Sequence, residues 1–222
     1  MFSLSGFSLH TMNDQSHPIL LSTAYLPPIE YFVQINQSDK IYIEQFENYH
    51  KQTFRNRCHI ASANGLLPLS IPVIKTDGNH TLIKNIAISN AEPWQKIHWR
   101  AIESAYNKSP FFLYYEDELR PFYFNRFENL LEFNIKLTEK LLHLIGIEKK
   151  IKLTTEFIHL PENMRDRRFE EKPKPELYKN YKPYIQVFSS KFKFFPNLSI
   201  IDLLFCEGPD AADYLNCLSP SA

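Results

Sequence analysis

The stretch ILLSTAYLPPIEYFVQINQSDKIYIE, residues 19–44, decides the fold because its hydrophobic pattern changes twice along its length. It opens with an apolar run over residues 19–24, which is typical of a buried strand. Pro27-Pro28 then marks a tight loop, and apolar residues return at helical spacing from residue 29 to 35. Residues 40–44 alternate as a second strand. This order of strand, loop, helix and strand predicts an opening βαβ unit.

A β-hairpin is predicted downstream of this unit. Asn64-Gly65 separates residues 54–62 from residues 66–73 and is a strong signal for a two-residue hairpin turn. Aliphatic residues occupy every second position of the later segment, and Pro68 and Pro72 lie on the opposite face. Because proline donates no ladder hydrogen bond, this segment should be an edge strand.

The rest of the chain is predicted to be mainly helical. Trp94 begins an apolar stripe that stops at Pro110, and Ser199 and Asp202 have the spacing of a capping box at the start of a later helix. We therefore expect an α/β (or α+β) fold with a mixed sheet, the opening strand-loop-helix-strand unit, the Asn-Gly hairpin and packed C-terminal helices. The remaining predicted elements are helices over residues 127–145, 200–205 and 209–215 and strands over residues 82–89 and 151–157.

A chain of 222 residues fits one domain. We expect a disordered leader over residues 1–17, with Met12 as an alternative start, and a single domain over residues 18–218. Within it, residues 160–181 are rich in Arg, Lys, Glu and Pro, which predicts a mobile basic loop. Its part between residues 165 and 174 is either a lid that closes over a ligand or a solvated charged tract.

Composition excludes several classes of function. The 25 basic and 25 acidic residues balance, so no global field attracts nucleic acid, and no recognised nucleic-acid module is present. No apolar run reaches the ~18 residues that a membrane span requires. The three cysteines and eight histidines show no metal-ligand spacing, so we expect no metal site. The cysteine pattern and the lack of a signal peptide indicate a cytoplasmic protein.

The densest candidate chemistry is the run HKQTFRNR, which ends at Arg57. If this run is extended, Arg55 and Arg57 point to one face, where two guanidiniums can bind phosphate or carboxylate. Lys51 adds a third positive charge. The alternative is a solvated edge strand whose arginines pair with Glu44 or Glu47.

Aromatic residues mark two further candidate positions. Trp94 and His98 lie one turn apart on a helix face, and His98 is either a general acid–base or a packed residue that a neighbour satisfies. Tyr25 lies in the loop after the first strand, where the ligands of α/β sheets sit, although this loop can also be a rigid turn.

These segments resemble the WbqC-like family over about residues 20–215. The most specific parts are Arg55-Asn56-Arg57 and the helix that carries Trp94 and His98. The chain departs from many relatives at residues 22–24, where they carry a His-Gln or Met-Gln pair. The matching segments are residues 25–32, residues 54–57 with Ile60, Gly65 with Leu69 and residues 71–73, Trp94, His98, Ile102, residues 105–106 and 109–111, and in the tail residues 184–188, 197–205 and 208–209.

The resemblance implies a role in surface-polysaccharide synthesis, because family members are encoded with such genes. We expect a transferase acting on a nucleotide-activated sugar or a similar phosphorylated precursor. The alternative is a non-catalytic binding or assembly protein of the same pathway. Neither a cofactor nor an oligomeric state follows from the sequence. The expected roles are phosphate binding by Lys51, Arg55 and Arg57, orientation of a hydroxyl by Asn56, acid–base catalysis by His98, and ligand contacts by Tyr25, Trp94 and Tyr106.

Overall fold

A four-stranded parallel sheet forms one part of the fold in the computed structural model, which describes residues 17–168 and 181–218. All three neighbouring pairs run parallel, in the order β7-β2-β1-β8. Helix α1 (Ile29–Asn36) connects β1 to β2, so the predicted opening βαβ unit is confirmed. The strands are β1 (Ile19–Leu21), β2 (Ile41–Ile43), β7 (Ile151–Leu153) and β8 (Arg165–Asp166).

The strand order reverses beside β1. The chain moves from β1 to β2 and then to β7 on one side, whereas β8 returns to the other side of β1. In α/β sheets the crevice at such a reversal, beyond the carboxyl ends of the strands, is where ligands bind. The residues that directly follow β1 and β8 are therefore the first place to look for a site.

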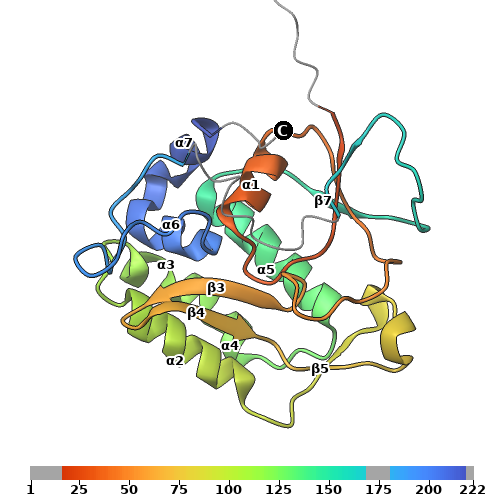
Figure 1. Ribbon diagram of the computed structural model, residues 1–222, viewed down its shortest axis with the longest axis horizontal. Helices are drawn as coiled ribbons and strands as arrows, with labels where there is room; N and C mark the ends of the chain where they lie inside the picture. Colours follow the sequence, from red (N-terminus) through yellow and green to blue (C-terminus); the bar gives the residue numbers. More distant parts are fainter. Residues whose placement is uncertain (1–16, 169–180, 219–222) are drawn as a thin grey trace, which may run out of the picture.

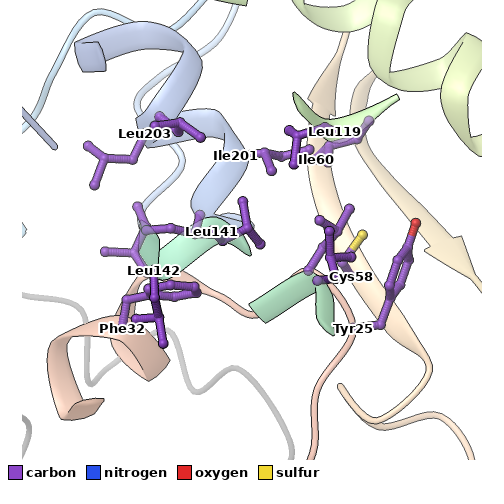
Figure 2. Packing of buried hydrophobic residues seen from close by; sticks show 14 of the residues in the cluster. Tyr25, Phe32, Cys58, Ile60, Leu119, Leu141, Leu142, Ile201 and Leu203 are labelled. Carbon is purple, nitrogen blue, oxygen red and sulfur yellow. The ribbon is translucent and has the colours of Figure 1, made fainter. Parts of the chain in front are cut away.

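The predicted hairpin is formed by β3 (Arg57–Ser62) and β4 (Gly65–Ser70) and is confirmed, but its register differs from the one that an Asn64-Gly65 turn would give. Ser62 pairs with Gly65, so the two turn residues are Ala63 and Asn64. Gly65 has φ 103°, a left-handed conformation that glycine adopts without strain. One face carries Cys58 and Ile60, which point into the core toward Tyr25 and Ile201 (Figure 2). The hairpin lies between α2 and α5 (Figure 1), with α2 packed against β3.

Seven helices and three short 3-10 turns are present in the described part of the chain. Helix α5 (Leu130–Ile145) has clear ends, because the Asn129 side chain accepts a hydrogen bond from Glu132 N and Gly146 has φ 84°. The others are α2 (Trp94–Tyr106), α3 (Phe112–Leu119), α4 (Pro121–Phe124), α6 (Ile200–Glu207), α7 (Ala211–Asn216), η1 (Gly78–His80), η2 (Ile83–Asn85) and η4 (Gly208–Asp210).

Several local predictions were wrong. The strand expected over residues 82–89 is the 3-10 turn η2 followed by the two-residue strand β6 (Ala87–Ile88), which pairs with β5 (Val73–Ile74). Helix α3 was not predicted, because the uninterrupted run of large hydrophobic residues over residues 111–115 hid its helical period. Ile97, expected in the buried stripe of α2, is 54% exposed, and Trp99 is buried instead.

The capping box at Ser199 and Asp202 does not form. The Ser199 hydroxyl makes no hydrogen bond, and the Asp202 carboxylate turns inward, where it accepts hydrogen bonds from Tyr106 and Tyr184. The two phenols offer a fully buried carboxylate the donors that it needs.

Two further expectations concern the ends of the described ranges. The proposed leader falls almost wholly outside the described residues, as does most of the basic loop. Among the described residues, no helix is long and apolar enough to cross a membrane.

Gly208 provides a stability test of the contact between α6 and the loop before α3. A Cβ at Gly208, where φ is 57°, would lie 2.5 Å from Cγ of Phe111. We expect Gly208→Ala to lower the free energy of unfolding by about 3 kcal/mol, measured by urea denaturation. Gly146→Ala is the control, since its Cβ meets nothing within 4 Å, and it should lose only about 1 kcal/mol. Equal losses would contradict the steric argument.

Candidate functional site

Arg55 is buried and fully engaged. Its side chain is 2% exposed, Nε donates to Glu47 Oε1 at 2.9 Å, and Nη2 donates to Glu47 Oε2 at 2.7 Å. Nη1 donates to the Thr53 hydroxyl at 3.2 Å, and Nη2 also donates to Ser22 Oγ at 2.8 Å. Arg55 therefore pairs with Glu47, as one interpretation of the sequence expected, although the pair is buried and not on a solvated edge strand.

The Arg55–Glu47 pair lies at the carboxyl ends of the parallel strands. Ser22 directly follows β1, and its hydroxyl lies 3.0 Å from Glu47 Oε2 and 2.7 Å from the backbone oxygen of Arg168. Arg168 lies just past β8, so Ser22 bridges the two strands at which the sheet order reverses. A polar cluster therefore occupies the place where ligands of parallel sheets bind.

A second buried ion pair adjoins the first. Glu44, the first residue after β2, is 0% exposed, and its Oε2 lies 3.3 Å from Arg168 Nη1. Glu44 Oε1 accepts the Thr154 hydroxyl at 2.8 Å, and Arg168 also binds Asp166 at 2.6 Å. Charges that are removed from water this completely are costly unless each has partners, so these contacts fix the carboxyl edge of the sheet.

Two of the four non-glycine residues with positive φ in the described part of the chain lie on the two segments that meet here. Leu26 has φ 40° and Gln52 has φ 62°, conformations that non-glycine residues rarely adopt. Tyr25 N donates to the Phe54 oxygen at 2.8 Å, which joins the loop after β1 to the loop before β3. Strained residues persist where surrounding contacts over-determine them, commonly at functional sites.

Arg57 differs from Arg55 because no carboxylate of the described residues neutralises its charge. It is half-buried, its Nε donates to Ser70 Oγ at 2.8 Å, and no carboxylate of the described residues forms an ion pair with it. Burial raises the pKa of Tyr49 to about 12, and the charges of both Arg55 and Arg57 oppose that rise. Burial and the charge of Arg57 lower the pKa of His59.

Asn56 and Lys51 are placed differently. Asn56 Nδ2 donates to the Ile71 oxygen at 2.8 Å, while its Oδ1 is buried without a partner among the described residues. Lys51 is exposed on the loop that precedes Thr53. Asn56 thus has an unused acceptor, and Lys51 has an exposed charge six residues before Arg57.

Tyr25, Trp94 and His98 form one buried cluster. The Tyr25 hydroxyl lies 2.9 Å from His98 Nδ1 and 3.1 Å from the Tyr123 hydroxyl, and the Trp94 ring packs edge-on against His98 with centroids 5.2 Å apart. Burial lowers the pKa of His98 to about 4, opposed by a hydrogen bond with the backbone of Ser70. His98 is therefore a neutral imidazole at physiological pH.

Tyr106 belongs to a separate cluster. Its hydroxyl donates to Asp202 Oδ1 at 2.9 Å, and Tyr184 and Gln186 donate to Oδ2 of the same carboxylate at 2.5 and 2.9 Å. The structure thus unites Tyr25, Trp94 and His98 and leaves Tyr106 apart. Arg55 belongs to the cluster with Glu47 and Ser22, whereas Arg57 contacts Ser70 on the hairpin.

Sequence reasoning missed Ser22, Ser70 and Tyr123 as partners of these residues. Ser22 carried a signal, since it directly follows the first strand. No sequence pattern indicated Ser70 or Tyr123, because the residues with which they form hydrogen bonds are distant in sequence. Among the described residues, no group of three or more His, Cys, Asp or Glu side chains is arranged to hold a metal ion.

The Arg55–Glu47 pair can be tested by substitution. Arg55→Met leaves the Glu47 carboxylate buried without its cation, so the free energy of unfolding should fall by about 3–5 kcal/mol in urea titrations. Adding Glu47→Gln should recover part of that loss. Arg126→Ala, which breaks an ion pair with side chains 71% and 68% exposed, should change stability by less than about 0.5 kcal/mol. A loss below 1 kcal/mol for Arg55→Met would contradict the buried pair.

His98 predicts a specific acid sensitivity. The unfolded chain binds the His98 proton near pH 6.5, whereas the folded protein binds it only near pH 4, so acidification through this window favours unfolding. We expect the wild type to lose up to about 3 kcal/mol more than His98→Gln between pH 6.5 and pH 4. Urea midpoints across this range measure the difference, and parallel curves would show that His98 titrates normally.

The chain is similar to a known protein and matches the model of a known family. The uncharacterized protein Rv1507c of Mycobacterium tuberculosis is 28% identical over 225 residues, which cover 88% of this chain and 96% of that protein. No solved structure matches the chain. The model of the WbqC-like protein family matches residues 23–170, which include the Arg55–Arg57 segment and the helix with Trp94 and His98. Because this match spans more than half of the chain, the protein belongs to the WbqC-like protein family.

Proposed function

We propose that the protein is a transferase acting on a nucleotide-activated sugar or another phosphorylated precursor of surface polysaccharide, and that Arg57 binds its phosphate. The observation that carries this proposal is the contrast between the two arginines. Arg55 is neutralised by Glu47, while Arg57 is half-buried and has no carboxylate partner among the described residues. A guanidinium in this state retains its charge and most of its donors for an anion.

The surroundings of Arg57 support an anionic ligand. Lys51 is exposed on the preceding loop, and His59 lies close enough for Arg57 to lower its pKa. The unpartnered Asn56 Oδ1 offers an acceptor for a sugar hydroxyl. In this proposal the positive groups hold the phosphates, and positioning with charge neutralisation supplies most of the catalytic effect.

The carboxyl edge of the sheet supports a sugar-binding role beside this phosphate site. Ser22 is half-buried there, between the Glu47 carboxylate and the Arg55 guanidinium. Hydroxyl groups of a sugar are recognised by such alternating donors and acceptors. Arg55 then acts as the group that holds Ser22 and Glu47 in place, rather than as a phosphate ligand.

One observation favours the alternative, a non-catalytic protein that binds the same precursor. His98 is 4% exposed, its Nδ1 lies 2.9 Å from the Tyr25 hydroxyl, and burial lowers its pKa to about 4. A general acid or base must reach the proton it transfers. If His98→Gln retains turnover while Arg57→Ala loses ligand binding, catalysis does not depend on this histidine.

A thermal-shift screen tests the anion site. We expect one class among UDP-, GDP-, dTDP- and CMP-sugars to raise the melting temperature of the wild type, since ligand at 100 times its Kd adds about 2.7 kcal/mol. Arg57→Ala should abolish the shift, because it removes the charge that holds the phosphate.

The matched control is Arg126→Ala, which removes an exposed arginine paired with Glu128 and should leave the shift intact. A shift that survives in Arg57→Ala would place the anion elsewhere. No shift with any nucleotide sugar or with inorganic pyrophosphate would reject the proposal.

A further inference from the structure

Helix α4 follows α3 without a break in helical geometry. Arg120, which separates the two, has φ −51° and ψ −41°, and its N–H donates to the Glu116 oxygen at 2.8 Å. The buried residues keep helical spacing across this junction, so the exposed residues also share one continuous surface. The buried residues are Phe112, Tyr115, Leu119 and Tyr123.

A stripe of four exposed residues runs along this surface. They follow one another at intervals of four, three and four residues, which place them on one side of the helix. The four are Leu113, Asp117, Arg120 and Phe124. Leu113 is 75% exposed and Phe124 is 57% exposed, so a large apolar side chain lies in water at each end of the stripe.

The two charges in the middle of the stripe are not paired within the chain. Asp117 and Arg120 lie one turn apart, yet neither forms an ion pair with any described residue, whereas the adjacent Glu118 binds Lys140 at 2.8 Å. The Arg120 guanidinium instead lies 5.0 Å from the centroid of the Phe124 ring. A guanidinium over a ring face keeps its in-plane N–H groups for a carboxylate.

The order of these residues is self-complementary. Read in reverse, the stripe places an apolar residue opposite each apolar residue and a charge of opposite sign opposite each charge. In an antiparallel pair of copies, Leu113 therefore faces the partner's Phe124, and Asp117 faces the partner's Arg120. Two-fold symmetric interfaces require this reciprocity, in which residue i contacts residue j and j contacts i.

We infer that the exposed face of α3 and α4 binds a second copy of this chain in an antiparallel, two-fold symmetric pair of helices. The order of charges selects this partner, because a stripe with one sign of charge would need a partner of different sequence. One pair of helices buries less surface than an obligate dimer does, so this dimer should exchange with monomer. The inference is independent of the anion site at Arg57.

Sedimentation velocity of the full chain between about 1 μM and about 1 mM tests for the dimer. Reducing buffer is required because Cys217 is exposed and unpaired. The average mass of the wild type should rise toward that of a dimer with concentration. Asp117→Arg and Arg120→Asp each place like charges opposite one another, so each variant should raise the dimer Kd at least about tenfold.

Mixing the two variants tests the antiparallel register. A chain with Asp117→Arg carries two positive charges in the stripe, and a chain with Arg120→Asp carries two negative charges. An equimolar mixture should therefore form a heterodimer, although each variant alone is monomeric over the same range. Melting temperatures should match the wild type, since all four substituted positions of the stripe are exposed.

Apolar substitutions test the ends of the stripe. Leu113→Ser and Phe124→Ser should each weaken the dimer because they remove an apolar contact that occurs twice in it. Leu160→Ser is the matched control, since Leu160 is 86% exposed on the loop between β7 and β8, and it should leave the dimer intact.

Three results would overturn the inference. A wild type that stays monomeric would assign the stripe to a different protein or to no partner. A dimer that persists in both charge variants would use another face. A mixture of the charge variants that stays monomeric would exclude the antiparallel pairing of Asp117 with Arg120.

Discussion

The need to neutralise one buried guanidinium organises this structure. Arg55 is among the largest side chains that are almost completely removed from water, and desolvated charge is tolerated only with a close, well-oriented counter-charge. Glu47 supplies that charge from the segment after β2, and Ser22 supplies an acceptor from the end of β1. Asn134 of α5 donates to the Arg55 backbone oxygen at 2.8 Å. The parallel sheet, the hairpin and α5 therefore meet at a single residue.

This constraint also explains how two arginines two positions apart come to differ. Arg55 lies just before β3 and turns toward the carboxyl edge of the sheet, where acidic residues gather. Arg57 is the first residue of β3, and its ladder partner is Ser70, a neutral side chain. No carboxylate of the described residues lies opposite Arg57, so its charge is not neutralised by an ion pair there.

Local patterns in the sequence were sufficient for the elements with strong periodicity or turn chemistry. The βαβ unit follows from the Pro27-Pro28 loop between two apolar runs, and the hairpin follows from Asn64-Gly65. Helix α3 was missed because large hydrophobic residues on its exposed face, Leu113 and Tyr114, stand between the buried Phe112 and Tyr115. Hydrophobic period carries no information when both faces are apolar.

The sequence pointed to the residues of the candidate site, but it did not give the interactions that each of them makes. The Arg-Asn-Arg run marked a place rich in chemistry, yet only the three-dimensional register shows that Glu47 claims one arginine and not the other. His98 was expected as an acid–base group because of the family resemblance, while its position one turn after Trp94 left a packed residue as the alternative. Its burial and its hydrogen-bond partner Tyr25 depend on segments far away in the chain, and no local pattern encodes them.

The carboxylate of Asp202 has a practical consequence for anyone who shortens this protein. The stretch matched by the family model stops at residue 170. Beyond it, Asp202 on α6 accepts a hydrogen bond from Tyr106 on α2, and Ile201 faces Ile60 and Leu119 in the interior (Figure 2). A recombinant fragment trimmed to residues 23–170 would lack α6, which covers one side of the core. The buried Tyr106 hydroxyl would then lose the carboxylate that accepts its hydrogen bond. Such a fragment would expose the aliphatic side chains that α6 buries, and it would aggregate. The minimal unit for expression therefore extends through α7.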